Sequence, residues 1–289
     1  MAGSSVTGQQ PGPTGGGLGA RVASAAVLAP LALGTAYLGG PVFIAVAWAA
    51  GVLAWLEWRR LLGRPTVDAA SVAGIAGLAA ACVLVALDGA VAAAAAAGAA
   101  ALVVAGVERG GLRVRAAGLA GAGIILLLVV ATLMLRGDGP AGRATVFWLF
   151  AVVWASDTGA YLAGRAIGGP RLAPRISPAK TWAGAIGGVA AALGASILLG
   201  WLMPLAGWVA ERPSFAPLAA VGVLGSIVGQ LGDLAESALK RRVGADDSGR
   251  LIPGHGGILD RGDSFAAAAF ALILATAISG GEPPWSYAP

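Results

Sequence analysis

Long apolar stretches recur along most of the chain, and they constrain its fold more than any other feature. A transmembrane helix needs about 20 predominantly apolar residues. Stretches of similar length lie at residues 22–38, 41–57, 70–87, 90–107, 116–135, 144–166, 182–203, 215–239 and 264–280. Hydrophobic residues make up 57% of the 289 residues and charged residues only 11%, which is too little polar surface for a soluble fold. The sequence therefore predicts an all-α, polytopic membrane bundle of about nine transmembrane helices.

Composition divides the chain into three regions. Residues 1–20 have no charged side chain and few large apolar ones, so we expect a disordered tail. They also lack a basic segment leading into a short apolar core, which argues against a cleaved signal peptide. Residues 21–143 should form the N-terminal transmembrane helices. Residues 144–289 should form a C-terminal membrane region that carries two polar loops, 165–181 and 240–263.

The basic residues are sorted to one side of the predicted bundle. Most of the 19 lie in loops that nine spans place on the same side, and the other side keeps only Arg136, Arg143 and Arg212. By the positive-inside rule, the N-terminus and both polar loops should be cytoplasmic and the C-terminus outside. The isoelectric point near 10.1 then reflects loops beside anionic lipid headgroups, so no nucleic acid partner is needed.

Carboxylates within membrane segments are costly and therefore candidates for function. Asp157 lies well inside the stretch 144–166. Asp233, Glu236, Ser237 and Lys240 are spaced i, i+3, i+4 and i+7, which places them on one face if the helix continues to Lys240. The alternative for these carboxylates is a set of interhelical hydrogen bonds or snorkelling helix ends.

The last apolar stretch begins with a second pair of carboxylates, Asp260 and Asp263. Asp263 could cap a helix, but a cap explains only one of them. Hard divalent cations such as magnesium prefer carboxylate oxygens, so Asp233, Asp260 and Asp263 are candidate ligands. Zinc is poorly supported, because the chain has one histidine, His255, and one cysteine, Cys82, which we expect to be buried and inert.

The loop 240–263 surrounds these carboxylates with groups that suit phosphate. The side chains of Lys240, Arg241 and Arg261 can contact phosphate oxygens, and Gly256 and Gly257 allow close approach of backbone amides. His255 could equally orient the turn or transfer a proton. Acids, basic residues and a glycine turn together indicate a phosphoryl- or nucleotidyl-transfer site.

The loop 165–181 is a second basic segment on the same side. Its sequence predicts Ser177 as a helix cap and Pro178 as the first helical residue. Lys180 and Thr181 would then project from a helix N-terminus, which favours anions. The alternative is a positive-inside loop that merely precedes a capped helix. No GxxxxGK[ST] segment occurs, so a Walker-type nucleotide loop is excluded.

The stretch SALKRRVGADDSGRLIPGHGGILDRGD resembles the signature of the phosphatidate cytidylyltransferases, also called CDP-diacylglycerol synthases. The matching positions are Ser237, Lys240, Arg241, Asp247, Pro253, Gly254, His255, Gly256, Gly257, Asp260, Arg261 and Asp263. The upstream segments DTGAY (157–161), ISPAKT (176–181) and GDLAES (232–237) match as well. Two positions depart from the family pattern: Asp246 stands where a lysine is usual, and Ala183 where a glutamate is usual.

The resemblance implies an enzyme that transfers CMP from CTP to phosphatidate with the help of magnesium, as one or two ions. The implied partners are CTP and membrane phosphatidate, with no nucleic acid, and a homodimer is an open alternative. The implied location is the bacterial inner membrane, with the catalytic region, 144–289, opening to the cytoplasm. The assigned residues are Asp233, Lys240, Asp260 and Asp263 for catalysis; Ser177, Lys180, Thr181, Ser237, Arg241, His255, Gly256, Gly257 and Arg261 for substrate; and Asp233, Asp260 and Asp263, with Asp247 as a further candidate, for metal.

Two alternative functions stay open on the sequence. A CTP-dependent enzyme could act on another lipid, such as an isoprenoid glycerol phosphate or a polyprenol. An ion-coupled transporter could instead use Asp157 and Asp233 along an ion path.

Overall fold

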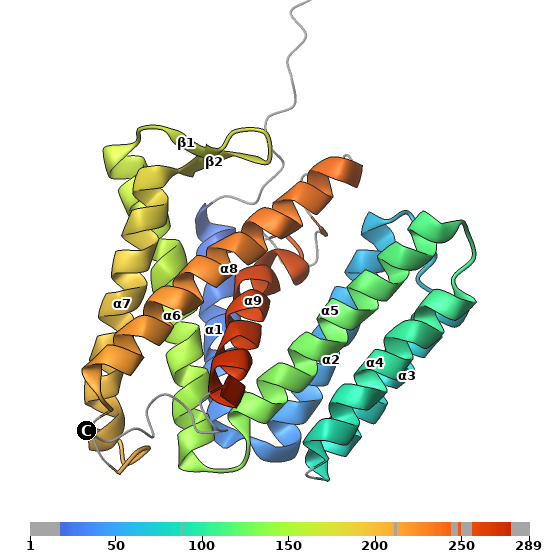
Figure 1. Ribbon diagram of the computed structural model, residues 1–289, viewed down its shortest axis with the longest axis horizontal. Coiled ribbons are helices and arrows are strands. Elements are labelled where there is room, and N and C mark those ends of the chain that lie inside the picture. The colour runs from blue at the N-terminus through green and yellow to red at the C-terminus, as the bar shows by residue number, and fades with distance from the viewer. Residues whose placement is uncertain (1–17, 88, 211–212, 244–247, 250–255, 279–289) are drawn as a thin grey trace, which may run out of the picture.

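The chain folds into a bundle of long helices with one small hairpin (Figure 1). The computed structural model describes residues 18–87, 89–210, 213–243, 248–249 and 256–278, so most of the predicted tail lies outside the described residues. The elements within these ranges are α1 (Leu18–Leu38), α2 (Gly40–Leu61), α3 (Ala69–Ala86), α4 (Ala90–Val107), α5 (Leu112–Arg136), α6 (Pro140–Ile167), β1 (Arg171–Ala173), β2 (Ser177–Thr181), α7 (Trp182–Leu205), α8 (Phe215–Val243) and α9 (Leu259–Ile278).

The structure confirms the all-α membrane bundle. Within the described part of the chain, eight helices are long and apolar enough to cross a membrane, and α1 contributes a shorter apolar segment, Val22–Leu38. Several helices extend past the apolar stretches that predicted them: α8 continues to Val243 and α9 already begins at Leu259. Helices continue through these polar residues because hydrophobicity marks the membrane core and not the end of backbone hydrogen bonding.

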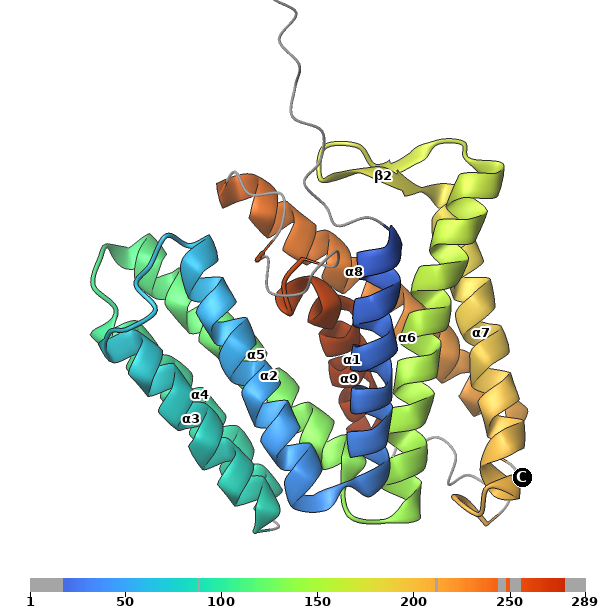
Figure 2. The ribbon, with the colours of Figure 1, turned by 180° about the vertical axis from the view of Figure 1, so that it is seen from behind.

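The helices pack in two groups that meet at α9. Helices α2 to α5 enclose one buried cluster, which includes Trp55, Trp58 and Leu126. Helices α6 to α9 enclose the other around Trp148, whose indole N–H donates to Ser196 Oγ at 2.9 Å. Figure 2 shows α1 on the back of the bundle, beside α6 and in front of α9.

Helices α6 and α7 pack very closely because small residues face each other. A Cβ atom at Gly159 would lie 2.7 Å from the carbonyl oxygen of Gly187, so only glycine fits there. Close backbone approach of this kind is a common basis of helix association in lipid. It places the hairpin, which precedes α7, directly at the end of α6.

The connections that carry most of the charge lie together at one end of the bundle (Figures 1 and 2). We call this the charged end: the α2–α3 and α4–α5 connections, the β1–β2 hairpin, and the adjoining ends of α8 and α9. This grouping agrees with the sorting of basic residues expected from the sequence. That the charged end faces the cytoplasm stays a prediction.

A buried ion-pair network fastens the α2–α3 and α4–α5 connections to each other. The Arg59 guanidinium, 1% exposed, pairs with both Glu108 and Asp68, and Arg64 Nη2 lies 2.7 Å from Glu108 Oε1. Asp68 also caps α3 by accepting from the Ser71 backbone N–H at 2.8 Å. Partial burial opposes ionisation of Asp68, but the Ser71 hydrogen bonds and the Arg59 charge outweigh it and lower the pKa of this carboxyl.

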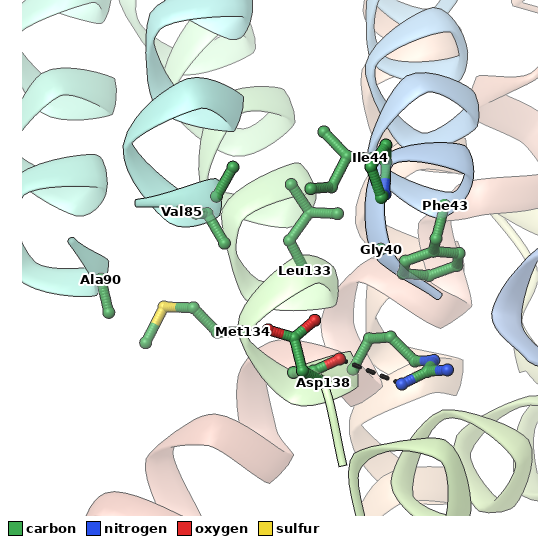
Figure 3. Close-up of a pocket in the computed structure, with 12 residues that line it drawn as sticks. Gly40, Phe43, Ile44, Val85, Ala90, Leu133, Met134 and Asp138 are labelled. Carbon is green, nitrogen blue, oxygen red and sulfur yellow. Dashed lines mark hydrogen bonds between the residues drawn. The ribbon is translucent and has the colours of Figure 1, made fainter. Parts of the chain in front are cut away.

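The opposite end of the bundle holds an open pocket of about 400 Å³, lined by apolar side chains and by Arg136 and Asp138 (Figure 3). Its wall includes Ile44, Val85 and Leu133, with Arg136 at one side. The Arg136 guanidinium donates to the carbonyls of Ala36, Tyr37 and Gly137, the last two at 3.0 Å. These contacts satisfy the last carbonyls of α1 and the end of α5, so Arg136 fastens helix ends together.

Candidate active site

The polar face of α8 predicted from the sequence is present. Lys240 Nζ lies 3.2 Å from Glu236 Oε2, and Ser237 Oγ lies 3.4 Å from Asp233 Oδ1. Both pairs are four residues apart, so their side chains meet on one face of the helix. The helix continues through Lys240 to the charged end, as the spacing required.

Lys240 also joins α8 to the start of α9. Its ammonium group lies 2.6 Å from Asp260 Oδ1, and both side chains are largely buried, at 12% and 7% exposed. Asp260 additionally accepts from the backbone N–H groups of Ser248, at 3.1 and 3.2 Å, and Gly257, at 2.8 Å. Asp260 therefore holds Lys240 and two backbone segments, residues 248–249 and 256–257, at one point. We call these two segments the glycine loop.

The hairpin reaches the same region through a second lysine. Lys180 Nζ on β2 lies 2.5 Å from Asp233 Oδ2 on α8. Arg241 Nε, about two turns further along α8, donates to the carbonyl of Ile176 at 3.4 Å. The two polar loops that the sequence singled out, 165–181 and 240–263, thus meet at the charged end.

The predicted helix entry at Ser177 and Pro178 is wrong. Residues Ser177–Thr181 form strand β2, which pairs antiparallel with β1. Helix α7 begins at Trp182, and Thr181 is its N-cap, with a side chain that accepts from the Gly184 N–H at 3.0 Å. Proline favours an extended residue before it, which suits a strand at Ser177, while the threonine hydroxyl supplies the cap.

The structure also excludes the interpretation of Asp263 as the cap of α9, because the helix begins four residues earlier, at Leu259. The Asp263 carboxyl instead approaches that of Glu236 on α8. Glu236 Oε1 is buried and has no hydrogen-bond partner among the described residues. Two neighbouring carboxyls of this kind are relieved by a bound cation or by a shared proton.

The described residues contain no group of three His, Cys, Asp or Glu side chains arranged to hold a metal ion. Asp233 and Asp260 each face a lysine, so ammonium groups contact carboxylate oxygens that the sequence assigns to metal. The magnesium site therefore stays a prediction.

The other residues predicted for the site lie near the two lysine–aspartate pairs or outside the described ranges. Asp157 on α6 lines a narrow gap together with Gln230 and Ser264. Arg261 lies in the first turn of α9 and is exposed. His255 and Asp247 lie outside the described residues, as do Pro253, Gly254 and the departing residue Asp246.

Sequence reasoning missed one carboxylate, Glu57. It closes the predicted stretch 41–57, yet in the structure it lies inside α2, is 2% exposed and accepts from the Leu259 N–H at 3.0 Å. The available signal was an acidic residue next to tryptophans, WLEW, at the end of an apolar stretch.

The fold and the charged end define a class: a helical membrane protein with lysine–carboxylate pairs suited to phosphate chemistry.

A model of the cytidylyltransferase family matches residues 19–279. The chain is 43% identical over 260 residues to the phosphatidate cytidylyltransferase of Brucella suis biovar 1 (strain 1330), covering 89% of this chain and 93% of the relative. It is 45% identical over 125 residues to that of Bacillus subtilis (strain 168), covering 43% and 44%. The chain belongs to the cytidylyltransferase family.

Proposed function

We propose that this protein transfers CMP from CTP to phosphatidate, giving CDP-diacylglycerol and pyrophosphate. The observation that carries the proposal is the convergence of two lysine–aspartate pairs, Lys180–Asp233 and Lys240–Asp260, at one end of a membrane bundle. Family membership supplies the cytidylyl chemistry, and a relative aligned over nearly its whole length bears the name phosphatidate cytidylyltransferase.

The reaction needs cationic groups more than a strong base. A phosphate oxygen of phosphatidate forms a bond to the α-phosphorus of CTP, and the bond from that phosphorus to the bridging oxygen breaks, so the electron pair leaves with pyrophosphate. Because the lipid phosphate is already an anion near neutral pH, the main obstacle is its repulsion by the nucleotide. Lys180 and Lys240 reduce this repulsion and orient the two phosphates.

Magnesium is part of the proposal. Asp233, Asp260 and Asp263 would hold it, with Asp247 as a further candidate ligand, and the donor-free Glu236 Oε1 supports a cation beside them. The bound ion would supply additional neutralisation of phosphate charge. Lys180 and Lys240 would then add positive charge beside the phosphates at positions that the metal ion does not occupy.

The charged end is also where the substrates can meet. CTP is soluble and phosphatidate is embedded, so the reaction requires a polar site at a membrane surface. The positive-inside pattern supports a cytoplasmic orientation in the bacterial inner membrane. Lys180 and Asp233 lie in this region as a pair, which does not favour a transport path through Asp233.

The test uses the full chain purified in detergent and given CTP labelled at the α-phosphate. With phosphatidate and magnesium, label should enter the lipid fraction in step with pyrophosphate release, and Lys240→Ala should reduce both. An isoprenoid glycerol phosphate and a polyprenol serve as parallel substrates. Transfer to one of these but not to phosphatidate would show that the lipid substrate is assigned wrongly. No transfer to phosphatidate or to either of these lipids would overturn the proposal that the protein is a CTP-dependent transferase.

A further inference from the structure

Glu57 belongs to the N-terminal half of the chain but contacts the start of α9. Its Oε2 atom accepts from the Leu259 backbone N–H at 3.0 Å, across 202 positions of sequence. The first N–H groups of a helix have no partner inside the helix, and a carboxylate near them is favoured by the helix dipole. Glu57 therefore caps α9 from another helix.

The backbone around the glycine loop closes over this carboxyl on two sides. A Cβ atom at Gly249 would lie 2.8 Å from Glu57 Oε1, and one at Gly257 would lie 2.5 Å from Glu57 Oε2. Real Cβ atoms essentially never approach so closely, so both positions require glycine while Glu57 keeps its place. Gly249 and Gly257 thus lie directly against the glutamate side chain.

Helix α2 holds Glu57 in a fixed position. The indole N–H of Trp55 donates to the Ser71 carbonyl at 3.3 Å, and that of Trp58 donates to the Ala117 carbonyl at 3.1 Å. Ile258 and Leu259 pack against the same buried cluster as these tryptophans. The glutamate therefore projects from a rigid element, as a group that positions others must.

Glu57 and Asp260 divide the backbone donors at this turn between them. Asp260 accepts from Ser248 and Gly257, while Glu57 accepts from Leu259, and Asp260 also pairs with Lys240. A shift of the turn would therefore move Asp260 relative to Lys240.

Glu57 differs from an ordinary helix cap because its carboxyl group is buried although one of its oxygens accepts no hydrogen bond from the described residues. Glu57 Oε1 and Ser248 Oγ are both buried and have no hydrogen-bond partner among the described residues. Burying such atoms costs stability, whereas a smaller exposed cap would not. This loss of stability is explained if the Glu57 carboxyl keeps the backbone of Gly249 and Gly257 in position.

We infer that Glu57 is a positioning residue: it fixes the start of α9 and the glycine loop so that Asp260 holds Lys240 toward the reacting phosphates. Glu57 acts through Asp260 and Lys240 and does not touch substrate. This inference rests on the proposed function, because it takes Lys240 as the group that meets phosphate and Asp260 as the group that holds Lys240.

The first test compares Glu57→Ala and Glu57→Gln in the purified full chain. Glutamine keeps an acceptor for the Leu259 N–H, so it should retain most of kcat. Alanine removes it and should lower kcat about 10- to 100-fold, the usual loss when a supporting group is removed, with little change in the KM for CTP. Equal losses in both variants, or a loss confined to KM, would overturn the inference.

Hydrogen exchange measured by mass spectrometry provides a readout that needs no activity. Glu57→Ala should accelerate exchange at the start of α9, residues 259–263, and leave the α4–α5 connection unchanged. Glu108→Gln is the matched control, because Glu108 is also 2% exposed but pairs with Arg59 and Arg64 away from the loop. Its effect should appear at the α4–α5 connection and spare residues 259–263. Unchanged exchange at 259–263 in Glu57→Ala would overturn the inference even in an active enzyme.

A double-variant cycle of Gly249→Ala and Glu57→Ala tests the contact even if a single variant folds poorly. The three atoms nearest to a Cβ at Gly249 all belong to Glu57, so Gly249→Ala should lose its effect on exchange and on kcat when Glu57→Ala is also present. Additive effects would contradict the contact. If none of the proteins transfers CMP but exchange at 259–263 responds as stated, the proposed function fails while the role of Glu57 at α9 stands.

Discussion

Lys180 Nζ and Asp233 Oδ2 lie 2.5 Å apart, and this ion pair joins the β1–β2 hairpin to α8 at the charged end. A similar pair, Lys240 and Asp260, joins α8 to α9. Helix α8 therefore carries one member of each pair, and its last turns are the common element of the candidate site. The two pairs suggest different roles, which kinetics can separate.

Replacing Lys180 should act mainly on substrate affinity. Lys180 lies on the hairpin and pairs with one carboxylate, Asp233, so we expect it to attract CTP or the lipid phosphate in ground and transition states alike. Lys180→Ala should raise KM for one substrate with a smaller change in kcat, in steady-state kinetics that vary CTP and phosphatidate separately. Lys180→Arg should preserve more affinity because it keeps the charge.

The Lys180–Asp233 contact also predicts coupling between the two positions. In a double-variant cycle of Lys180→Ala and Asp233→Ala, the change in log(kcat/KM) of the double variant should be smaller than the sum of the single changes, because contacting residues do not act independently. Strict additivity would show that the pair does not operate together in the working enzyme.

Replacing Lys240 should lower kcat. Its ammonium group lies between Glu236 and Asp260, and its side chain is 12% exposed against 26% for Lys180, so two carboxylates hold its charge in a fixed place. Losing one preorganised electrostatic contact costs about 2–4 kcal/mol of transition-state stabilisation, so Lys240→Ala should reduce kcat about 30- to 1,000-fold. Arg242→Ala, on the same turn but exposed, is the matched control and should change kcat little. If Lys240→Ala raises only KM while Lys180→Ala abolishes kcat, the two roles are reversed.

Asp260 has two roles that different substitutions can separate. It pairs with Lys240 and holds the backbone at Ser248 and Gly257. Asp260→Ala should therefore lower activity by orders of magnitude and loosen the turn. Asp260→Asn keeps an oxygen acceptor for the turn but loses the charge for Lys240 and for magnesium, so it should remain inactive while hydrogen exchange at 256–263 stays slow.

Magnesium dependence provides the control for Asp260. The unaltered protein should lose activity with EDTA and regain it when magnesium is added in excess. Near-normal activity of Asp260→Ala in magnesium would contradict its assignment as a ligand.

The sequence predicted the membrane bundle and the grouping of its charged loops, because both follow from long-range hydropathy and charge. The i, i+3, i+4 and i+7 spacing likewise predicted one polar face on α8, where Lys240 meets Glu236, since the helix period alone decides which residues share a face. The pairing of Lys180 with Asp233 was not predicted, because it depends on how the hairpin folds over α8. The hairpin itself was missed because Ser177 and Pro178 suit a helix start as well as a strand.

Glu57 shows a different limit of sequence reasoning. Its position at the end of an apolar stretch is typical of a residue at the membrane surface, and nothing local indicates a partner 202 positions away. The contact exists because the end of α2 approaches the start of α9, and that approach depends on the shapes of Trp55, Trp58 and the residues around them. Interactions between distant helices of this kind become visible only in the folded protein.

The buried network around Arg59 should make stability depend on acidic pH through Asp68. The folded pKa of this carboxyl lies below its ordinary value of 3.8, so its ionised form stabilises the fold. That contribution is complete above the ordinary value and is lost as the pH falls through the folded value. The melting temperature in detergent should therefore fall with acid less steeply in Asp68→Asn than in the unaltered protein. Parallel curves for the two proteins would contradict the contribution of Asp68.

Thr181 should act as a helix cap and not as a substrate contact. Its side chain is only 5% exposed and accepts from the Gly184 N–H at 3.0 Å, which leaves it facing the start of α7. Loss of such a cap typically costs about 1 kcal/mol, so Thr181→Ala should lower the melting temperature in detergent, whereas Thr181→Ser keeps the hydroxyl and should melt close to the unaltered protein. The KM for CTP, measured on folded protein, should be nearly the same in all three. If Thr181→Ala melts normally but raises that KM, then the hydroxyl binds substrate, as the family resemblance implied, and the capping contact is secondary.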